Sequence, residues 1–265
     1  MKFIIHIVCV LFPFCLSAQV ENQSQPDSIY FKYNVKRIFV YENSEKDLSK
    51  IIQYDKSGKI LNIQEFSASY NRKTRNFKSL NIIKDYKYDD KNRLIKIEQH
   101  HGSQIDSTVF EYKLNLLVLK KQFVNSDTPT YITAYNYNPF SETTTQEKDS
   151  VIIYQKTKEY DKDFYVKKFY GFSLTPKLKT TVSIIDGKEN NLQYIDWNEM
   201  LRYEDVKIIE NSFDKEGKLL QSKVTSNFMN NRTINYFLKY SYYKNGLLKS
   251  IRGYVPLFFK YEYFE

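Results

Sequence analysis

Two adjacent histidines, in the phrase "EQHHGSQID", are the first residues whose type suggests metal or acid–base chemistry. His100 and His101 are neighbours, and adjacent residues of a strand point to opposite faces, so their rings would not converge on one metal ion. Gly102 follows them directly, which is typical of a hairpin turn. We therefore predict that both histidines are surface residues beside a turn, with no metal and no catalytic role.

Two carboxylate patterns are the next candidates for chemistry. Asp161 and Asp163 in "YDKDF" stand at i and i+2, which places them on one strand face, and glycosidases use a carboxylate pair. Such pairs face each other across a cleft, however, and aspartates in short polar phrases are typical of turns. The phrase "DKSGKI" resembles a calcium loop, but counting from Asp55 puts Ile60 and Phe66 where an EF-hand needs Gly and Glu.

Signatures of a serine nucleophile elbow, a zinc protease or a phosphate loop are absent from the sequence. We therefore predict that the protein is not an enzyme and needs no cofactor. Aromatic residues are the other candidates for chemistry, since the phrases "YKY" and "YSY" each place two rings on one strand face. The single tryptophan stands between Asp196 and Asn198, where it could stack on a sugar ring or join the core. The candidate stacking residues are Trp197, Tyr86, Tyr88, Tyr240 and Tyr242.

One short phrase recurs along the chain and predicts the elements that position these residues. "QYDKSGKIL" at residues 53–61 returns as "SFDKEGKLL" at 212–220, and more loosely as "KYDDKNRLI" at 87–95 and "SYYKNGLLK" at 241–249. The aspartate can accept a hydrogen bond from the backbone two residues on, and Gly or Asn then takes the left-handed conformation of a hairpin turn. The predicted turn residues are Asp55, Gly58, Asp89, Asn92, Asp214, Gly217, Asn245 and Gly246.

The aromatic residues before these turns recur about every 26 residues, which is the length of two strands and their turns. The longest gap is expected to hide a degenerate hairpin at residues 195–201. A short helix at residues 196–203 competes with it, because Asp196 and Glu199 form a weak capping box. The predicted fold class is all-β, with tandem antiparallel β-hairpin repeats forming an elongated curved sheet.

These phrases resemble a known family. The Tyr-Asp-x-x-Gly-x-Leu pattern is similar to the YD repeats of RHS-type proteins, and "YYKNGLLKS" at residues 242–250 resembles a MORN-variant repeat. The resemblance covers most of residues 50–265 and implies antiparallel sheets that curl into shells or ribbons. The core motif of large RHS proteins and a toxin domain are absent, so the resemblance implies a fold and no activity.

The beginning of the chain predicts export. Lys2 precedes an apolar run and the small residues Ser17 and Ala18, which is the pattern of a secretory signal peptide over residues 1–18. Residues 19–49 would lead into the first hairpin, and residues 50–265 would form the repeat domain. Both cysteines lie in the leader, so the mature chain would contain neither disulfides nor thiol chemistry. We expect a Sec-exported protein that is periplasmic, cell-surface or secreted.

The predicted role is that of an exported, non-catalytic β-repeat scaffold or binding protein of the cell envelope. With a net charge of +9, its partner could be an envelope protein or an anionic glycan, whereas nucleic acid is not expected outside the cytoplasm. Open sheet edges suggest self-association. The first alternative is a glycan-binding or carbohydrate-active protein using exposed Tyr. The second is an outer-membrane β-barrel, although the neighbouring lysines in "LKKQF" and "VKKF" would place one lysine of each pair in lipid.

Overall fold

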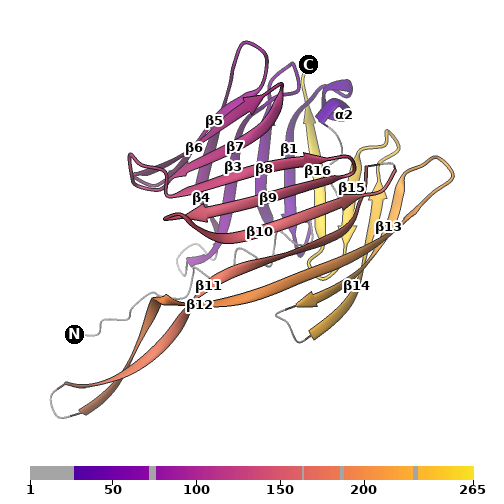
Figure 1. The fold of residues 1–265 in the computed structure, drawn as a ribbon. Coiled ribbons are helices and arrows are strands. Elements are labelled where there is room, and N and C mark those ends of the chain that lie inside the picture. The colour runs from indigo at the N-terminus through magenta and orange to yellow at the C-terminus, as the bar shows by residue number, and fades with distance from the viewer. Residues whose placement is uncertain (1–26, 72–75, 163, 186–187, 229–231) are drawn as a thin grey trace. The chain divides into compact units, whose positions relative to one another are not determined.

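A computed structural model describes residues 27–71, 76–162, 164–185, 188–228 and 232–265, so the predicted signal peptide lies outside the described residues. Within these ranges the chain forms one short helix and sixteen strands (Figure 1). The helix is α2 (Asp27–Lys32), and the strands are β1 (Val35–Glu42), β2 (Leu48–Tyr54), β3 (Ile60–Asn71), β4 (Asn76–Tyr88), β5 (Leu94–His101), β6 (Gln104–Lys113), β7 (Leu116–Phe123), β8 (Tyr131–Asn138), β9 (Ser141–Lys148), β10 (Val151–Tyr160), β11 (Val166–Ile185), β12 (Lys188–Phe213), β13 (Leu219–Phe228), β14 (Arg232–Tyr242), β15 (Leu248–Arg252) and β16 (Leu257–Tyr263).

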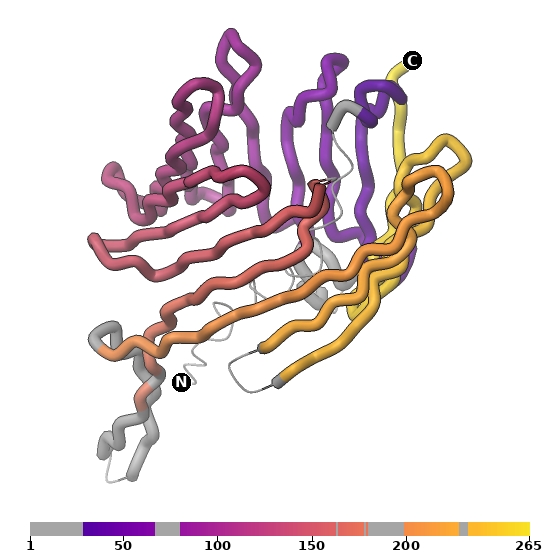
Figure 2. Tube along the Cα trace, turned by 45° about the vertical axis from the view of Figure 1, so that its right-hand side comes forward, coloured from indigo at the N-terminus to yellow at the C-terminus, as the bar shows by residue number. Residues whose placement is uncertain are grey.

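The strands pair in chain order, and the hydrogen-bonded order returns from β16 to β1, which gives the topology of a closed antiparallel barrel. Seven residue pairs join the first and last strands, from Val35 opposite Tyr263 to Glu42 opposite Leu257, and Figure 2 shows the yellow C-terminal strand beside an indigo strand. The all-β, antiparallel part of the prediction is confirmed. The open curved sheet is wrong, and with β1 paired to β16 the expected free edges for self-association are absent from the described strands.

The repeated phrase closes its hairpins as its chemistry predicts. In the turn between β2 and β3, the Asp55 carboxylate accepts the backbone N–H groups of Ser57 (2.8 Å) and Lys59 (2.9 Å), and Gly58 adopts a φ of 83°. Asp89 and Asp214 make the same pair of bonds in their own turns. The left-handed position is held by Asn92 (φ 64°), Gly217 (φ 79°) and Gly246 (φ 87°) in the other copies.

Tyrosines of the repeat also tie one hairpin to the preceding one. The Tyr88 hydroxyl donates a hydrogen bond to the carbonyl of Ile60 (3.0 Å), which is the first residue of β3. The Tyr242 hydroxyl donates in the same way to Leu219 (2.8 Å), the first residue of β13. Each of these rings therefore covers the start of the return strand of the hairpin before it, which explains why the phrase keeps an aromatic residue before the turn.

The chain divides into two compact units. Unit 1 comprises the residues up to Thr108 with Glu210–Lys223 and Tyr236–Glu265, and unit 2 comprises Val109–Ile209 with Val224–Asn235. In unit 1 the core cluster consists of Val35, Ile38, Tyr54 and Leu247, each at most 3% exposed. Helix α2 packs against this cluster, and its Tyr30 ring lies 5.4 Å from the Tyr54 ring and 6.4 Å from the Tyr261 ring. The sheet face that carries this cluster is called the core face of unit 1 below.

Unit 2 is organised around β10, β11 and the N-terminal part of β12. Phe169 is 2% exposed, and the Lys156 ammonium group lies 4.2 Å from the centre of its ring. The β11–β12 hairpin is long because its register continues from Lys168 opposite Ile208 to Ile185 opposite Lys188. An irregularity beside Pro176 interrupts the pairing, as expected for a residue without a backbone N–H.

The region expected to hide a degenerate hairpin or a short helix, residues 195–203, lies inside the single strand β12. Register explains this outcome, because β11 supplies partners on both sides of the irregularity, from Met200 opposite Pro176 to Asp196 opposite Lys177. Among the helices that the structure describes, none has the length and apolar character needed to cross a membrane.

Candidate functional site: an aromatic and basic depression beside the last turn

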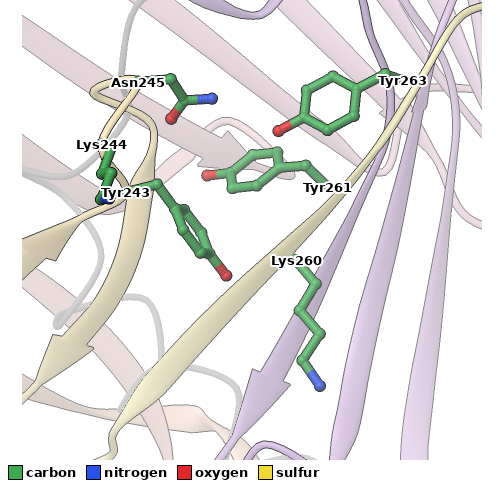
Figure 3. A pocket seen from close by; sticks show the side chains of 6 residues that line it. All are labelled: Tyr243, Lys244, Asn245, Lys260, Tyr261 and Tyr263. Carbon is green, nitrogen blue, oxygen red and sulfur yellow. The ribbon is translucent and has the colours of Figure 1, made fainter.

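A depression of about 620 Å³ lies in unit 1, where the turn between β14 and β15 meets β16 (Figure 3). Successive strand residues alternate in direction, so β16 presents the rings at positions 261 and 263 on one face. Figure 3 shows these two rings beside the turn that carries the other half of the site. The lining residues are Tyr243, Lys244, Asn245, Lys260, Tyr261 and Tyr263.

The backbone and side-chain hydrogen bonds hold two of the tyrosines in place. The Tyr243 hydroxyl donates to the carbonyl of Phe259 (2.9 Å), and the Tyr261 hydroxyl donates to the carbonyl of Leu248 (2.7 Å). Their rings meet edge to face, with centroids 6.0 Å apart and planes at 80°. Because both hydroxyls already donate within the protein, these residues offer a ligand their ring surfaces, of which Tyr243 is 37% exposed.

The turn itself forms one side of the depression. Gly246 donates its N–H to the carbonyl of Tyr243 (2.9 Å), Tyr243 donates to the carbonyl of Leu247 (2.8 Å), and the Asn245 side-chain oxygen accepts the N–H of Leu247 (3.2 Å). Asn245 and Gly246 were predicted as turn residues from the sequence. The structure additionally places Asn245 at a candidate ligand site, with its side-chain oxygen used by the turn.

Two lysines, Lys244 and Lys260, are among the lining residues. The Lys260 side chain leads away from the rings of Tyr261 and Tyr263 (Figure 3), and its ammonium group lies 4.8 Å from the centre of the Tyr41 ring and donates to the carbonyl of Glu45 (3.4 Å). Burial raises the pKa of Tyr243 above its ordinary value, and the nearby acidic groups of Glu45 and Tyr263 add to that effect. The six lining residues include no carboxylate, so the site lacks the groups for paired acid–base catalysis and suits an anionic or aromatic-stacking ligand.

The tyrosines proposed from the sequence for ligand stacking lie elsewhere. Tyr240 is 7% exposed, and its hydroxyl lies 3.2 Å from the Ser222 hydroxyl. Tyr88 and Tyr242 use their hydroxyls for the carbonyls of the preceding hairpins, and Tyr86 is half-buried in β4. Trp197 lies in β12, and its side chain is outside the described residues.

The three tyrosines of the depression were not predicted as a group. The phrase "YEY" at residues 261–263 was a visible signal, because it resembles "YKY" and "YSY". What the sequence did not show is that β16 lies beside both β15 and β1, so that the last strand faces the last repeat turn.

The two histidines point to opposite faces of β5. The His100 side chain lies 3.3 Å from the Asp85 carboxylate, whereas His101 contacts Gln99 and lies 3.9 Å from the Asp106 carboxylate. The Asp161 carboxylate accepts the N–H of Tyr165 (2.9 Å) in a turn, and Asp163 lies outside the described residues. In the part of the chain that the structure describes, no three His, Cys, Asp or Glu side chains are grouped so that they could hold a metal ion.

Comparisons with known proteins give distant likenesses. The sequence matches no family model and no curated protein. The structure is similar to a porin-like protein from Bacteroides uniformis, with a TM-score of 0.41 and 11% identity over 86% of this chain and 98% of that chain. It is also similar to the chain of a TcdB2-TccC3-TEV structure, with a TM-score of 0.32 and 14% identity over 75% of this chain and 9% of the other. Both TM-scores lie below 0.5, and neither likeness identifies the function of this chain.

Proposed function

We propose that this chain is an exported, non-catalytic β-barrel protein of the cell envelope. Its wall contacts water and is not embedded in lipid, and it binds an anionic glycan at the aromatic and basic depression. The signal-peptide pattern at residues 1–18 supports export. The closed strand order supports a stable all-β mature chain that needs no disulfides, because each of the described strands is paired on both sides. The placement in water rests on one polar row of the wall in unit 1.

One row of residues carries that argument. On the face opposite the core face, one row in register across six neighbouring strands of unit 1 is entirely polar or charged, whereas the next row on that face also holds Phe39, Ile51 and Ile83. The row adjacent to it along the strands lies on the core face and is mainly apolar, with Ile38, Ile52 and Ile63 in register. The polar row consists of Glu262, Arg37, Gln53, Asn62, Asp85 and Glu98.

Ion pairs follow this polar row. Glu262 pairs with Lys36 (3.0 Å) and Arg37 (3.4 Å), and Glu98 pairs with Lys87 (2.6 Å) and Lys96 (2.9 Å). A wall that faces lipid needs an apolar band, and a Lys or Arg at mid-depth costs about 2–4 kcal/mol. Six polar positions in one row therefore favour contact with water on this face of unit 1.

The placement in water is tested by purifying the mature chain, residues 19–265, without detergent. We expect a folded, monodisperse protein with a β-type circular dichroism spectrum. Aggregation in buffer, together with folding only in detergent micelles, would contradict the proposal. A fusion that reports export in the source cell checks the leader independently.

The glycan part is tested by titrating the chain with a uronic-acid oligosaccharide and following tyrosine fluorescence or calorimetry. Tyr263, which is 45% exposed in the depression, is replaced by Ala, and we expect a loss of about tenfold in affinity, as for one stacking ring. Tyr254→Ala is the matched control, because Tyr254 is 90% exposed and does not line the depression. Equal affinities of the wild type and Tyr263→Ala would overturn the assignment.

A second candidate function is an outer-membrane β-barrel, and the closed strand order favours it over the open-sheet scaffold predicted from the sequence. In lipid, every backbone polar group must be paired within the protein, and closure between β1 and β16 meets this requirement. This candidate predicts a chain that stays with outer membranes after carbonate extraction. The detergent-free purification above distinguishes the two.

A further inference from the structure

One face of the sheet in unit 2 is buried between β8 and β11. Thr133 of β8 lies opposite Gln146 of β9, and the register continues from Gln146 through Tyr154 of β10 to Ser173 of β11. Residues that lie opposite one another share a face, and Phe169, four residues before Ser173 on the same strand, shares it too. Thr133 and Phe169 are both 2% exposed. This face is called the core face of unit 2.

The charges on the core face of unit 2 are mostly positive. In register from β7 to β12, as far as the irregularity beside Pro176, this face carries more lysines than carboxylates. The lysines are Lys120, Lys148, Lys156, Lys158 and Lys207, and the carboxylates are Glu142 and Asp205. The Glu142 carboxylate lies opposite Lys158 and accepts a hydrogen bond from the Tyr160 hydroxyl (3.1 Å). The Asp205 carboxylate lies 3.6 Å from the Lys207 ammonium group.

Lys120 of β7 is half-buried on this face and lacks a counter-ion. Among the residues that the structure describes, none forms a hydrogen bond or an ion pair with its ammonium group. The Glu111 carboxylate of β6 pairs with Lys121, which points to the opposite face. Glu142 is four residues along β9 from Gln146, which is about 13 Å at the rise of a strand. Burial lowers the pKa of Lys120 below its ordinary value, as expected for a desolvated ammonium group.

The Thr133 hydroxyl, across from Lys120, also lacks a partner. The two residues lie directly opposite each other on β7 and β8, which places their Cβ atoms about 5 Å apart on one face. The Thr133 Oγ1 atom is buried and forms no hydrogen bond within the described part of the chain. On its other side, the Gln146 side-chain N–H donates to Gln122 (3.1 Å). A buried hydroxyl without a hydrogen bond and a half-buried ammonium group without a counter-ion both cost free energy, and one anion held between them would relieve both costs.

We propose that Lys120 and Thr133 form a binding site for one carboxylate group, in which the ammonium group holds one oxygen and the hydroxyl donates to the other. The long Lys120 side chain is flexible, so its rotation admits the ligand to the buried hydroxyl. The excess of lysines on the face attracts the anion. This site goes beyond the proposed function and lies in the other unit from the glycan depression. Either proposal can therefore fail while the other holds.

The test is an NMR titration of the mature chain labelled with carbon-13 at the lysine Cε atoms. Sodium acetate is compared with sodium chloride at the same ionic strength, so that ordinary screening is subtracted. We expect one lysine signal to shift saturably with acetate, and Lys120→Met should remove both this signal and the binding. Thr133→Val keeps the size of the side chain and should weaken acetate binding about tenfold, as for one hydrogen bond to a charged group.

The matched control is Lys158→Met. It removes one positive charge from the same face, beside Glu142, and leaves the proposed site intact. Its acetate affinity should stay within about twofold of the wild type, because only the general attraction of the face changes. A loss as large as that of Lys120→Met would overturn the proposal, since the charge of the whole face would then be responsible.

Melting temperatures distinguish a ligand site from a structural pair. Without acetate, Thr133→Val and Lys120→Met should each melt at the temperature of the wild type or above it, because each removes a polar group that has no partner. A lower melting temperature of Thr133→Val would mean that the hydroxyl is bonded within the fold, and this would overturn its assignment to a ligand. The Lys120→Met titration still tests the ammonium group in that case.

A second titration identifies the source of the carboxylate. Glucuronate replaces acetate, and its binding is read on the same Lys120 signal. Tighter binding than that of acetate would assign the site to a uronic-acid residue, and weaker or equal binding would assign it to a free small acid. Tyr263→Ala should bind acetate like the wild type, which keeps this test separate from the glycan test. The proposal is overturned if acetate produces no shift beyond that in chloride, or if Lys120→Met retains the affinity for acetate.

Discussion

The turns of unit 1 and unit 2 differ at one backbone position. In unit 1, the left-handed residue of the turns between β2 and β3 and between β12 and β13 is Gly58 or Gly217, which has no Cβ to be crowded. In unit 2, turns after even-numbered strands carry Leu114, Phe140 and Phe164 in the same region. These left-handed positions are therefore held in unit 1 by residues that favour the conformation and in unit 2 by residues that disfavour it. The difference teaches that strand pairing holds these turns of unit 2 closed even where the residue at the left-handed position disfavours that conformation.

The largest effect on stability is expected at a glycine whose neighbours leave no room for a Cβ, although its φ is ordinary. A Cβ on Gly171 would lie 2.0 Å from the backbone oxygen of Gln155 on the neighbouring strand β10, where no flexible atom can move aside. Gly171→Ala should therefore lower the free energy of unfolding by about 3 kcal/mol or prevent folding. Urea denaturation measures the change. Gly217→Ala is the matched control, because nothing lies within 4 Å of its added Cβ and only the φ of 79° opposes it.

The next effect concerns the core of unit 1. Leu247 is fully buried directly after a left-handed glycine, so Leu247→Ala should cost about 2–4 kcal/mol by removing packed methyl groups. Leu114→Ala in unit 2 removes the same atoms from a side chain that is 90% exposed, and it should change the stability by less than about 0.5 kcal/mol. Similar losses of stability in the two variants would contradict the distinction between a buried core side chain and an exposed turn side chain.

An exchange between the units tests the comparison of the turns directly. Gly217→Phe should cost about 1–2 kcal/mol, because it places a Cβ in the left-handed region of a unit 1 turn. Phe164→Gly relieves that strain in unit 2 but removes the ring stacking with Phe140, so its stability should stay within about 1 kcal/mol of the wild type. Thermal denaturation of both variants gives the answer. A loss from Phe164→Gly as large as that from Gly217→Phe would mean that the phenylalanine serves the fold.

The smallest effect is a dependence on pH from the turns of unit 1. The backbone N–H of Arg93 is the main cause that lowers the pKa of Asp89, and the Arg93 guanidinium adds to it against a smaller effect of burial. A carboxyl whose pKa is lowered on folding stabilises the protein above its unfolded pKa of about 4, and this contribution disappears as the pH falls through the lowered value. Urea midpoints of the wild type and Asp89→Asn should therefore differ at pH 6 and converge towards pH 2. A difference that does not change with pH would exclude this carboxyl as the cause.

Part of the candidate site could be foreseen and part could not. The turn that carries Asn245 and Gly246 was predicted from its phrase, because a hairpin turn depends on residues that are adjacent in the chain. The depression itself depends on β16 lying beside that turn. This pairing could not be predicted, because neither sequence segment shows which strand it pairs with. For the same reason Tyr240, a candidate for stacking, is a buried residue whose environment is set by Ser222 on another strand.

The sequence by itself determined the local elements of this protein: the alternation that makes strands, the aspartate and glycine that make turns, and the spacing that makes successive hairpins. These depend on steric and hydrogen-bonding preferences over a few residues, and they are visible in a repeated phrase. The tertiary structure alone decided that β1 pairs with β16, that α2 covers the core face of unit 1, and that residues 195–203 continue a strand. Those outcomes depend on which distant backbone groups find partners, and a short motif carries no information about its distant partner.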